Sequence, residues 1–484
     1  MTTQEQDHRL QLLNSLLTTP HRDLDKIYSS HKTIIDEDPI FYRQISAWYY
    51  DNGDIRDAKE VFIANLCMHD DTEFRNTGLA LLRQLPPYQV YRTVKFIKSK
   101  RKNAPRSVAT EVTNYLRERE EDRDWFDSSV LNARKQLKNL YIMFHVKPSE
   151  YAQQVLFDDD PPSDSKLYSL KLLSRATTPM EQAEIIVKER IPYRLASSVV
   201  KSMTPVVIFA LIDVMTTQEL INNLNSLKKR GAFDNEDIKS VIEEKLAKAK
   251  TDKKVAALKG VKAIESGNFS EDIQDKILDV VDSQVKSKGR IKKPTAIFVD
   301  KSQSMSEGIK VGIDLASTIS TSVDNSLYCY AFDTMPYKLE NGTGFKHWEN
   351  VFKHIKARGG TLPSVPFANM IKNKEYVEQI VLITDEGENY TNDFLNGLIR
   401  YEQAMNVKPN VFIVRCGHQR FRHTIITESL RKSGREVDDY DFDGDYYALP
   451  GLVKFLSRPS RLELLMEVMS YPLPKRKTSV VTSV

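Results

Sequence analysis

The spacing of apolar residues changes once along the chain, and the change divides the sequence into two parts. From the amino terminus to about Leu258, apolar residues such as Ala58, Val61 and Phe62 recur three or four positions apart. This spacing predicts helices with one buried face, and one of them is expected over residues 88–100, directly after a pair of prolines. Paired amphipathic helices with short loops predict an α-solenoid of HEAT-like units, although the sequence shows no clean repeat period.

Short apolar runs replace the helical spacing from Thr295 onward. Residues 295–299 and 379–384 form largely apolar runs of strand length, and the acids Asp300 and Asp385 follow them directly. Such runs predict strands that are buried on both faces, as in a parallel sheet covered by helices. Strand-like and helix-like segments alternate here, which predicts a doubly wound α/β domain. In such sheets ligands bind beyond the carboxyl ends of the strands, where both acids are expected to lie.

Five oxygen-bearing side chains are predicted to gather at this edge of the sheet. Asp300, Ser302 and Ser304 occupy alternate positions, Thr361 follows two glycines, and Asp385 ends the later apolar run. One carboxylate and two hydroxyls at alternate positions can converge on a single hard cation, and oxygen-only ligation suits Mg²⁺, Mn²⁺ or Ca²⁺. As an alternative, Ser304 forms a capping box with the glutamate three residues later and begins a helix.

Basic residues cluster at two places in the helical part. The candidates for RNA binding are Lys98, Lys100, Arg101, Lys102, Arg106, Arg134, Lys135 and Lys138. Tyr91 and Phe96 lie beside the first cluster. Lysines with aromatic neighbours suit the phosphate backbone and the stacked bases of single-stranded RNA. The alternative is a set of solvated helix faces, which is what most runs of charge are.

Composition restricts the class of protein further. The formal net charge is +4, so any affinity for nucleic acid must come from local patches. A content of 40% hydrophobic and 28% charged residues is typical of a globular protein. The cysteines, Cys67, Cys329 and Cys416, are far apart, which predicts reduced, buried thiols and a cytoplasmic location. We expect no membrane association, because no signal peptide begins the sequence and no apolar run approaches the length of a membrane span.

These patterns predict four segments. They are an all-α HEAT-like domain over residues 1–285, a basic linker over 286–294, a doubly wound α/β domain over 295–470, and a disordered tail over 471–484.

The set of five oxygens resembles the metal-ion-dependent adhesion site of von Willebrand factor type A domains, in which Asp-x-Ser-x-Ser precedes a distant Thr and a distant Asp. The resemblance implies that the hydroxyls bind the ion directly and that the acids act largely through water. A coordination position then remains for a carboxylate or phosphate oxygen of a partner. This sequence departs from the pattern at Glu386, which follows Asp385 where the family usually has glycine. Its charge is expected either to tighten metal binding or to repel an acidic partner.

A helical-repeat part followed by such a domain resembles the TROVE family of Ro ribonucleoproteins. Lys138 and the stretch from His145 through Lys147 to Pro148 are similar to a motif of that family, and residues 191–224 are similar to its late helices. The resemblance implies a ring of helices closed by the A domain, with ends of misfolded RNAs in its basic central hole and small Y RNAs outside. It also makes Lys138, His145 and Lys147 RNA contacts. For His145 the alternative is a helix-end histidine that satisfies backbone groups.

We expect no enzymatic activity, because the sequence contains no Gly-x-Ser-x-Gly elbow, no HExxH helix and no acid pair beside an obvious nucleophile. The expected function is binding of small noncoding and aberrant RNAs in RNA quality control, as a ribonucleoprotein. The expected partners are RNA and either an exoribonuclease or an acidic protein ligand at the metal. Two alternatives stay open. One is a protein-binding scaffold that acts through the metal, and the other is a phosphoesterase in which the ion activates water.

Overall fold

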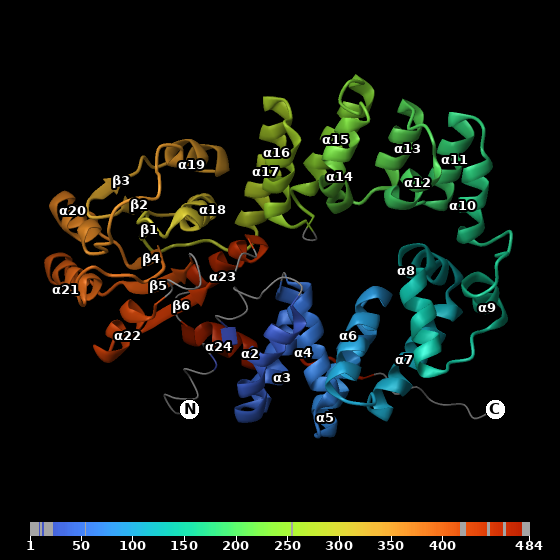
Figure 1. The fold of residues 1–484 in the computed structure, drawn as a ribbon, viewed down its shortest axis with the longest axis horizontal. Coiled ribbons are helices and arrows are strands. Elements are labelled where there is room, and N and C mark those ends of the chain that lie inside the picture. The colour runs from blue at the N-terminus through green and yellow to red at the C-terminus, as the bar shows by residue number, and fades with distance from the viewer. Residues whose placement is uncertain are drawn as a thin grey trace. The chain divides into compact units, whose positions relative to one another are not determined.

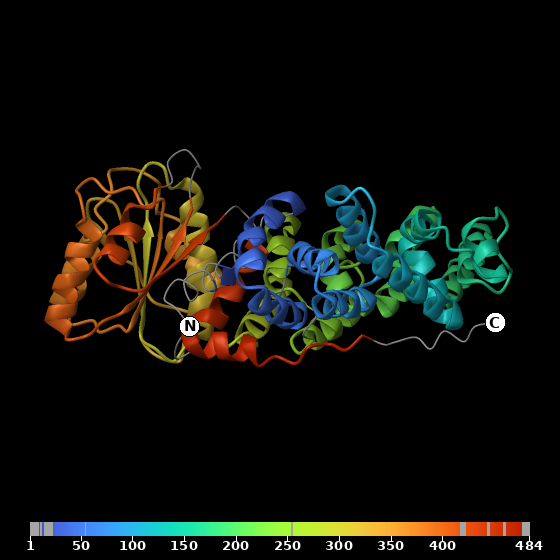
Figure 2. The same ribbon diagram turned by 90° about the horizontal axis from the view of Figure 1, so that it is seen from below.

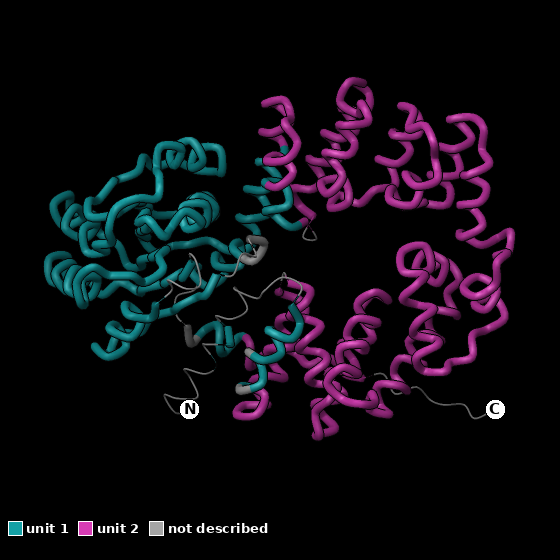
Figure 3. The backbone as a smooth tube through the Cα atoms, in the orientation of Figure 1, with its two compact units in different colours: residues 1–34, 256–261, 277–467 teal, residues 35–255, 262–276, 468–484 magenta. Residues whose placement is uncertain are grey.

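The computed structural model describes residues 9, 12–13, 23–53, 55–252, 255–416, 423–442, 446–457 and 461–476. The chain forms two compact units. Unit 1 comprises residues 1–34, 256–261 and 277–467, and unit 2 comprises residues 35–255, 262–276 and 468–484 (Figure 3). No helix in the described part of the chain is both long and apolar enough to cross a membrane.

Unit 2 is a curved row of helices (Figure 1). Its helices are α3 (Pro39–Asn52), α4 (Arg56–Met68), α5 (Thr72–Gln84), α6 (Pro87–Lys100), α7 (Arg106–Glu121), α8 (Arg123–Phe144), α9 (Glu150–Leu156), α10 (Lys166–Arg175), α11 (Pro179–Glu189), α12 (Tyr193–Val199), α13 (Pro205–Val214), α14 (Thr217–Lys229) and α15 (Glu236–Ala249). Three further helices contribute residues to both units, namely α2 (Leu24–Glu37), α16 (Ala257–Gly267) and α17 (Glu271–Lys286). The predicted helical array is confirmed.

Local sequence signals begin these helices. The Asp122 side chain accepts a hydrogen bond from the Trp125 N–H at the start of α8. At the start of α14, Thr216 and Glu219 exchange side-chain and backbone hydrogen bonds as a capping box. Proline occupies the first turn of α6, where a missing N–H costs nothing. Each helix then buries an apolar face against its neighbours, so that α6 packs on both α4 and α8.

The end of the chain is a strap on unit 2. The hydroxyl of Tyr471 donates to Asp51 at 2.6 Å, and the guanidinium of Arg476 lies 2.7 Å from the buried carboxylate of Glu111. The prediction of a disordered tail is therefore wrong for residues 471–476, because a buried acid requires the charge that Arg476 supplies. Residues 477–484 of that predicted tail lie outside the described residues.

Unit 1 contains a six-stranded sheet with the order β3-β2-β1-β4-β5-β6. Its strands are β1 (Thr295–Asp300), β2 (Leu327–Phe332), β3 (Pro336–Lys338), β4 (Gln379–Thr384), β5 (Asn410–Arg415) and β6 (Val437–Asp441). Only β3 is antiparallel to its neighbour within this described sheet. The other elements are α18 (Ser306–Ser322), α19 (Phe345–Phe352), α20 (Val365–Asn373), α21 (Asp393–Met405), α22 (Ile425–Lys432), η2 (Tyr446–Gly451), α23 (Leu452–Leu456) and α24 (Arg461–Met469), the last of which ends in unit 2.

Helices cover both faces of this sheet (Figure 2), as the continuous apolar runs predicted. Alternate residues of β1 enter two different cores. Phe298 lies in a core with Phe367 of α20 and Leu398 of α21. Val299 lies in the other core, with Trp348 of α19. The predicted doubly wound α/β fold is confirmed.

The α/β unit begins before residue 285, where the helical domain was predicted to end. Val281 and Val285 of α17 lie in the same core as Val299. Within the predicted linker over 286–294, Ile291 is fully buried, and its N–H donates to the carbonyl of Ser322 at 2.9 Å. These residues therefore belong structurally to the α/β unit, because their apolar side chains complete its core.

Candidate functional site

The sheet topology brings both strand-end acids to one edge. β1 and β4 are parallel neighbours, with Val299 opposite Ile383. Asp300 and Asp385 therefore leave the sheet side by side at its carboxyl edge, where the loop to α18 also begins. The hydroxyl of Ser304, from that loop, donates to a carboxylate oxygen of Asp385 at 2.5 Å.

Asp300 is the most enclosed member of the set. Its carboxylate accepts a hydrogen bond from the N–H of Ser302 at 2.8 Å and another from the hydroxyl of Thr384 at 2.9 Å. Burial raises the pKa of Asp300 to about 6 against these hydrogen bonds, and the nearby charge of Asp385 adds to the increase. Two neighbouring carboxylates in such a place favour a bound cation, because it stabilises their charged forms.

Two serine residues lie beside these acids. The Oγ atoms of Ser302 and Ser304 are 3.5 Å apart, and Ser302 is almost fully buried. Ser304 precedes α18, which begins at Ser306 without a side-chain cap. The capping-box alternative for Ser304 is therefore wrong, and its hydroxyl is directed to Asp385 instead.

Backbone contacts bring the loop of Thr361 to the same edge. The N–H of Arg358 donates to the carbonyl of Lys301 at 2.7 Å, and the N–H of Asn389 donates to the carbonyl of Thr361 at 3.1 Å. Gly359, which lies between Arg358 and Thr361 in the sequence, has a φ of 88°, a left-handed conformation that favours glycine. Thr361 itself is buried. Its loop thus joins the segments after β1 and β4.

A third acid at this edge is paired with a lysine side chain. Asp333 follows β2, and its carboxylate forms a buried ion pair with the ammonium of Lys301. Burial opposes ionisation of Asp333, but the hydrogen bond from Lys301 and nearby backbone N–H groups lower its pKa overall. The sequence reasoning missed Asp333, although its position directly after a strand was a usable signal.

Two further acids after β4 contact groups outside the set. Glu386 is fully buried and forms an ion pair with Arg415, at 2.7 Å. One oxygen of Glu388 accepts from the N–H of Phe394 at the start of α21, and burial raises the pKa of Glu388. Arg415 thus compensates the charge of Glu386, so the effects expected from that charge, tighter metal binding or repulsion of an acidic partner, stay predictions without support from this geometry.

The donor set fits a hard cation. Asp300, Asp385 and the hydroxyls of Ser302, Ser304 and Thr361 offer only oxygen, which Mg²⁺, Mn²⁺ and Ca²⁺ prefer. Within the described residues, no group of three or more His, Cys, Asp and Glu side chains is placed to hold a metal. A cation here would therefore depend on hydroxyls as well as on its two acids.

The predicted RNA-binding residues lie on neighbouring helices of unit 2. Lys98 and Lys100 end α6, Lys135 and Lys138 lie on α8, and these two helices pack together. All candidates are exposed except Lys138, which is half-buried; the exposed ones are Lys98, Lys100, Arg101, Lys102, Arg106, Arg134, Lys135, His145 and Lys147. The structure thus places most of the two basic segments on, or directly after, two helices that pack against each other.

Two of these arginines hold the fold together. Arg101 donates to the carbonyl of Met68, the last residue of α4, at 2.7 Å. Arg134 donates to the carbonyls of Val155 and Leu156 at the end of α9, at 3.3 and 3.2 Å. Free carbonyls at a helix end attract a cation, so these guanidiniums act as caps.

His145 ends α8 in a left-handed conformation with a φ of 53°. Its backbone N–H donates to the carbonyl of Ile142 at 3.3 Å, while its side chain is exposed. The backbone of His145 caps the helix and leaves the imidazole available. The sequence reasoning overlooked Ile142, whose side chain is 55% exposed one turn before His145 on the same helix.

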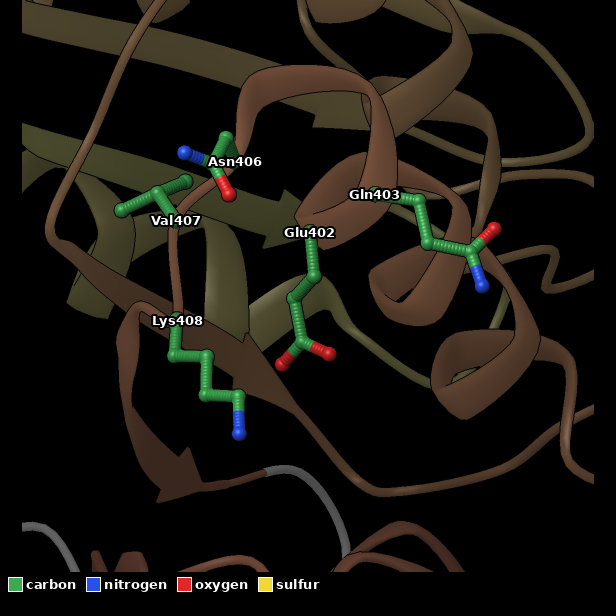
Figure 4. Close-up of a pocket in the computed structure, with 5 residues that line it drawn as sticks. All are labelled: Glu402, Gln403, Asn406, Val407 and Lys408. Atoms are coloured by element: carbon green, nitrogen blue, oxygen red, sulfur yellow. The ribbon is translucent and has the colours of Figure 1, made fainter.

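A hollow elsewhere in unit 1 is unrelated to the strand-end site. Glu402, Gln403, Asn406, Val407 and Lys408 line it between the end of α21 and the start of β5 (Figure 4). It therefore lies at the amino edge of the parallel strands, opposite the candidate metal site. Glu402 is already paired with Arg435 at 2.5 Å.

Comparisons with known proteins agree with this architecture. No family model matches the chain, and no curated protein matches its sequence. The crystal structure of the Ro (RSR) protein of Deinococcus radiodurans is similar, with a TM-score of 0.66 and 15% sequence identity. The match covers 93% of this chain and 100% of that chain, so it spans the helical part and the α/β part alike. This chain therefore has the fold of a Ro protein, as its resemblance to the TROVE family predicted.

Proposed function

We propose that this chain is a non-catalytic RNA-binding protein of the Ro type. In this proposal unit 2 binds single-stranded RNA, and the sheet edge of unit 1 binds Mg²⁺ or a similar divalent cation. The observation that carries it is the similarity to a Ro protein over 93% of the chain. We extend the proposal to cytoplasmic quality control of small noncoding and misfolded RNAs, with an exoribonuclease as a partner.

The chemistry of α6 and α8 supports an RNA ligand. Lys95, Lys98 and Lys102 are exposed at spacings of three and four residues, so they line one face of α6 and its end. On α8, Lys135 and Ile142 are exposed one heptad apart, and the imidazole of His145 follows. Lysines bind phosphates, and flat or apolar side chains between them support unstacked bases.

In this proposal the candidate cation would bind an oxygen of the ligand. Asp300 and Asp385 would hold it together with the hydroxyls of Ser302, Ser304 and Thr361. When bound, the ion supplies a positive charge with a coordination position that attracts an oxygen of a phosphate or carboxylate. The protein's own residues orient the carboxylates through the hydrogen bonds to Asp300 and Asp385 described above.

A gel-shift titration with a 20-nucleotide single-stranded RNA tests the RNA part. We expect the triple variant Lys98→Glu, Lys102→Glu, Lys135→Glu to bind at least 100-fold more weakly, because three phosphate contacts become repulsive. A matched control replaces three exposed lysines of unit 1 by glutamate, Lys353, Lys372 and Lys408, and changes the net charge equally. Equal affinities of the two triple variants would remove α6 and α8 from the proposal.

A second candidate function is a protein-binding scaffold that uses the cation to capture an acidic side chain. Two exposed apolar residues favour it, namely Met335 at 60% and Tyr390 at 68% exposure. Both lie in loops that hydrogen bond to the segment of Thr361, through Asp333 at 2.9 Å and Asn389 at 3.1 Å. Sequencing of RNA that copurifies with the chain separates the two functions, because a scaffold brings down no RNA above background.

A further inference from the structure

We propose that Glu386 is a positioning residue for the candidate cation site. Its buried ion pair with Arg415 fixes the backbone after β4 in the conformation that orients both Asp385 and Asp300. The inference rests on the proposed cation site and names the device that holds that site ready for the ion.

The conformation of Glu386 is the first observation. Its φ is 62°, in the left-handed region that glycine adopts freely and other residues avoid. Among the described residues, six other non-glycine residues have positive φ, and all six are exposed. Glu386 differs from them because it is fully buried. A strained, buried conformation persists only where the surroundings over-determine it.

The carboxylate of Glu386 provides that restraint. It accepts from Nε of Arg415 at 2.8 Å, and from the N–H and the hydroxyl of Thr427 at 2.8 and 2.7 Å. Arg415 also pairs with Asp439 at 2.9 Å and Asp441 at 2.6 Å, both on β6. The side chain thus joins the end of β4 to β5, β6 and α22.

The backbone on either side of this anchor orients the two acids. The N–H of Glu386 donates to the Thr384 hydroxyl at 3.0 Å, which in turn donates to Asp300 at 2.9 Å. The next N–H, of Gly387, donates to Oδ1 of Asp385 at 3.0 Å and leaves Oδ2 directed toward Ser304. A rotation of the backbone at residue 386 would disturb both carboxylates together.

Binding of Mn²⁺ to the full chain, measured by electron paramagnetic resonance, tests the inference. We expect Glu386→Ala to weaken Mn²⁺ binding about tenfold, because alanine keeps the strain of the left-handed backbone and loses the anchor. Glu386→Gly should bind Mn²⁺ more tightly than Glu386→Ala, since glycine adopts this conformation without cost. A residue with a purely structural role would not produce this order of affinities.

The matched control is Glu375→Gln. Glu375 is a buried acid of the same unit, paired with Lys338 and hydrogen-bonded to the hydroxyl of Tyr330 at 2.6 Å, and it precedes the amino end of β4. We expect this variant to lower the thermal midpoint without changing Mn²⁺ affinity. If Glu386→Ala does not fold, Arg415→Lys replaces it, because lysine keeps the charge but not the paired contacts.

The outcomes distinguish failure of this inference from failure of the proposed cation site. If the wild type binds neither Mn²⁺ nor Mg²⁺, the proposed cation site and this inference both fail. If the wild type binds Mn²⁺ and neither Glu386→Ala nor Arg415→Lys weakens binding, the cation site stands and the positioning role of Glu386 is overturned.

Discussion

Unit 2 and the sheet edge of unit 1 both bury acids, but the groups that lie beside these acids differ. In unit 2, Glu60 lies against Arg92 at 3.1 Å, and Glu111 lies against Arg476 at 2.7 Å. These arginines come from other helices or from the end of the chain, so each pair links segments that are far apart in the sequence. Such acids are part of the packing between elements.

At the sheet edge of unit 1, Asp300 and Asp385 form no ion pair with a lysine or arginine within the described ranges. Their neighbour Asp333 has Lys301, and Glu386 has Arg415. The comparison teaches that the type of partner, and not burial alone, distinguishes a structural acid from a candidate ligand for a cation. Four predictions sharpen this comparison, from the largest expected effect to the smallest.

The largest effect is expected at Glu60. Burial raises the pKa of Glu60 to about 8, although Arg92 opposes the increase. The unfolded state therefore loses this proton near pH 4.5, whereas the folded state keeps it until about pH 8. The stability that protonated Glu60 contributes is complete below pH 4.5, decreases as the pH rises, and is lost once the pH has risen through 8. We expect wild type to lose about 3 kcal/mol more than Glu60→Gln between pH 5 and pH 9.

Urea unfolding at several pH values measures this difference. Glu150→Gln, which changes an exposed acid of α9, is the control and should follow the wild type. Parallel pH profiles for wild type and Glu60→Gln would show that Arg92 neutralises Glu60 fully.

The second prediction concerns the cation. At a Mg²⁺ concentration of 100 times Kd, binding should stabilise the wild type by about 2.7 kcal/mol. The double variant Ser302→Ala, Ser304→Ala should show no such gain, because it loses two of the hydroxyls that we propose as ligands. Thermal unfolding with and without Mg²⁺ provides the measurement. An equal gain in both proteins would place the bound ion elsewhere.

The third prediction concerns the strap. Arg476→Met leaves the buried carboxylate of Glu111 with Arg83 alone, at 3.1 Å. We expect a loss of about 2 kcal/mol in the free energy of unfolding, since a buried charge loses half of its compensation. Tyr471→Phe, which removes an exposed hydrogen bond of the same strap, should stay within about 0.5 kcal/mol of the wild type. Similar losses in both variants would contradict a specific role for the pair with Glu111.

The smallest effect is expected for Arg134 and Lys135, two adjacent basic residues of α8. Arg134→Met removes the cap on α9 and should cost about 1 kcal/mol of stability with little change in RNA affinity. Lys135→Met should leave stability unchanged and reduce the salt dependence of RNA binding by about one unit of slope. The reverse pattern would assign Lys135 to the fold and Arg134 to the ligand.

Much of the α/β unit followed from its sequence. Apolar runs of strand length located β1 and β4, and the rule that parallel strands share a carboxyl edge placed Asp300 and Asp385 together. The strand β6 escaped prediction because Asp438, Asp439 and Asp441 make it look like a loop. Those acids are tolerated there since Arg415 pairs with two of them.

The helical unit was predicted less completely. Helical spacing located its elements, including α6, whose observed bounds are Pro87–Lys100. Charge alone did not show which basic residues were already used by the fold. Arg101 and Arg134 cap distant helices, and their partners lie 33 and up to 22 residues away in the sequence. The ring that the TROVE resemblance implies concerns the placement of the two units and stays a prediction.

The sequence by itself determined the division into a helical part and an α/β part and the edge at which the oxygen-bearing side chains gather, because periodicity and the order of parallel strands depend on local pattern. The tertiary structure alone decided the role of each charge. It directed Glu386 to Arg415, Lys301 to Asp333 and Arg476 to Glu111. A buried charge is stabilised by whatever group the fold brings within about 3 Å, and no spacing along the chain specifies that distance.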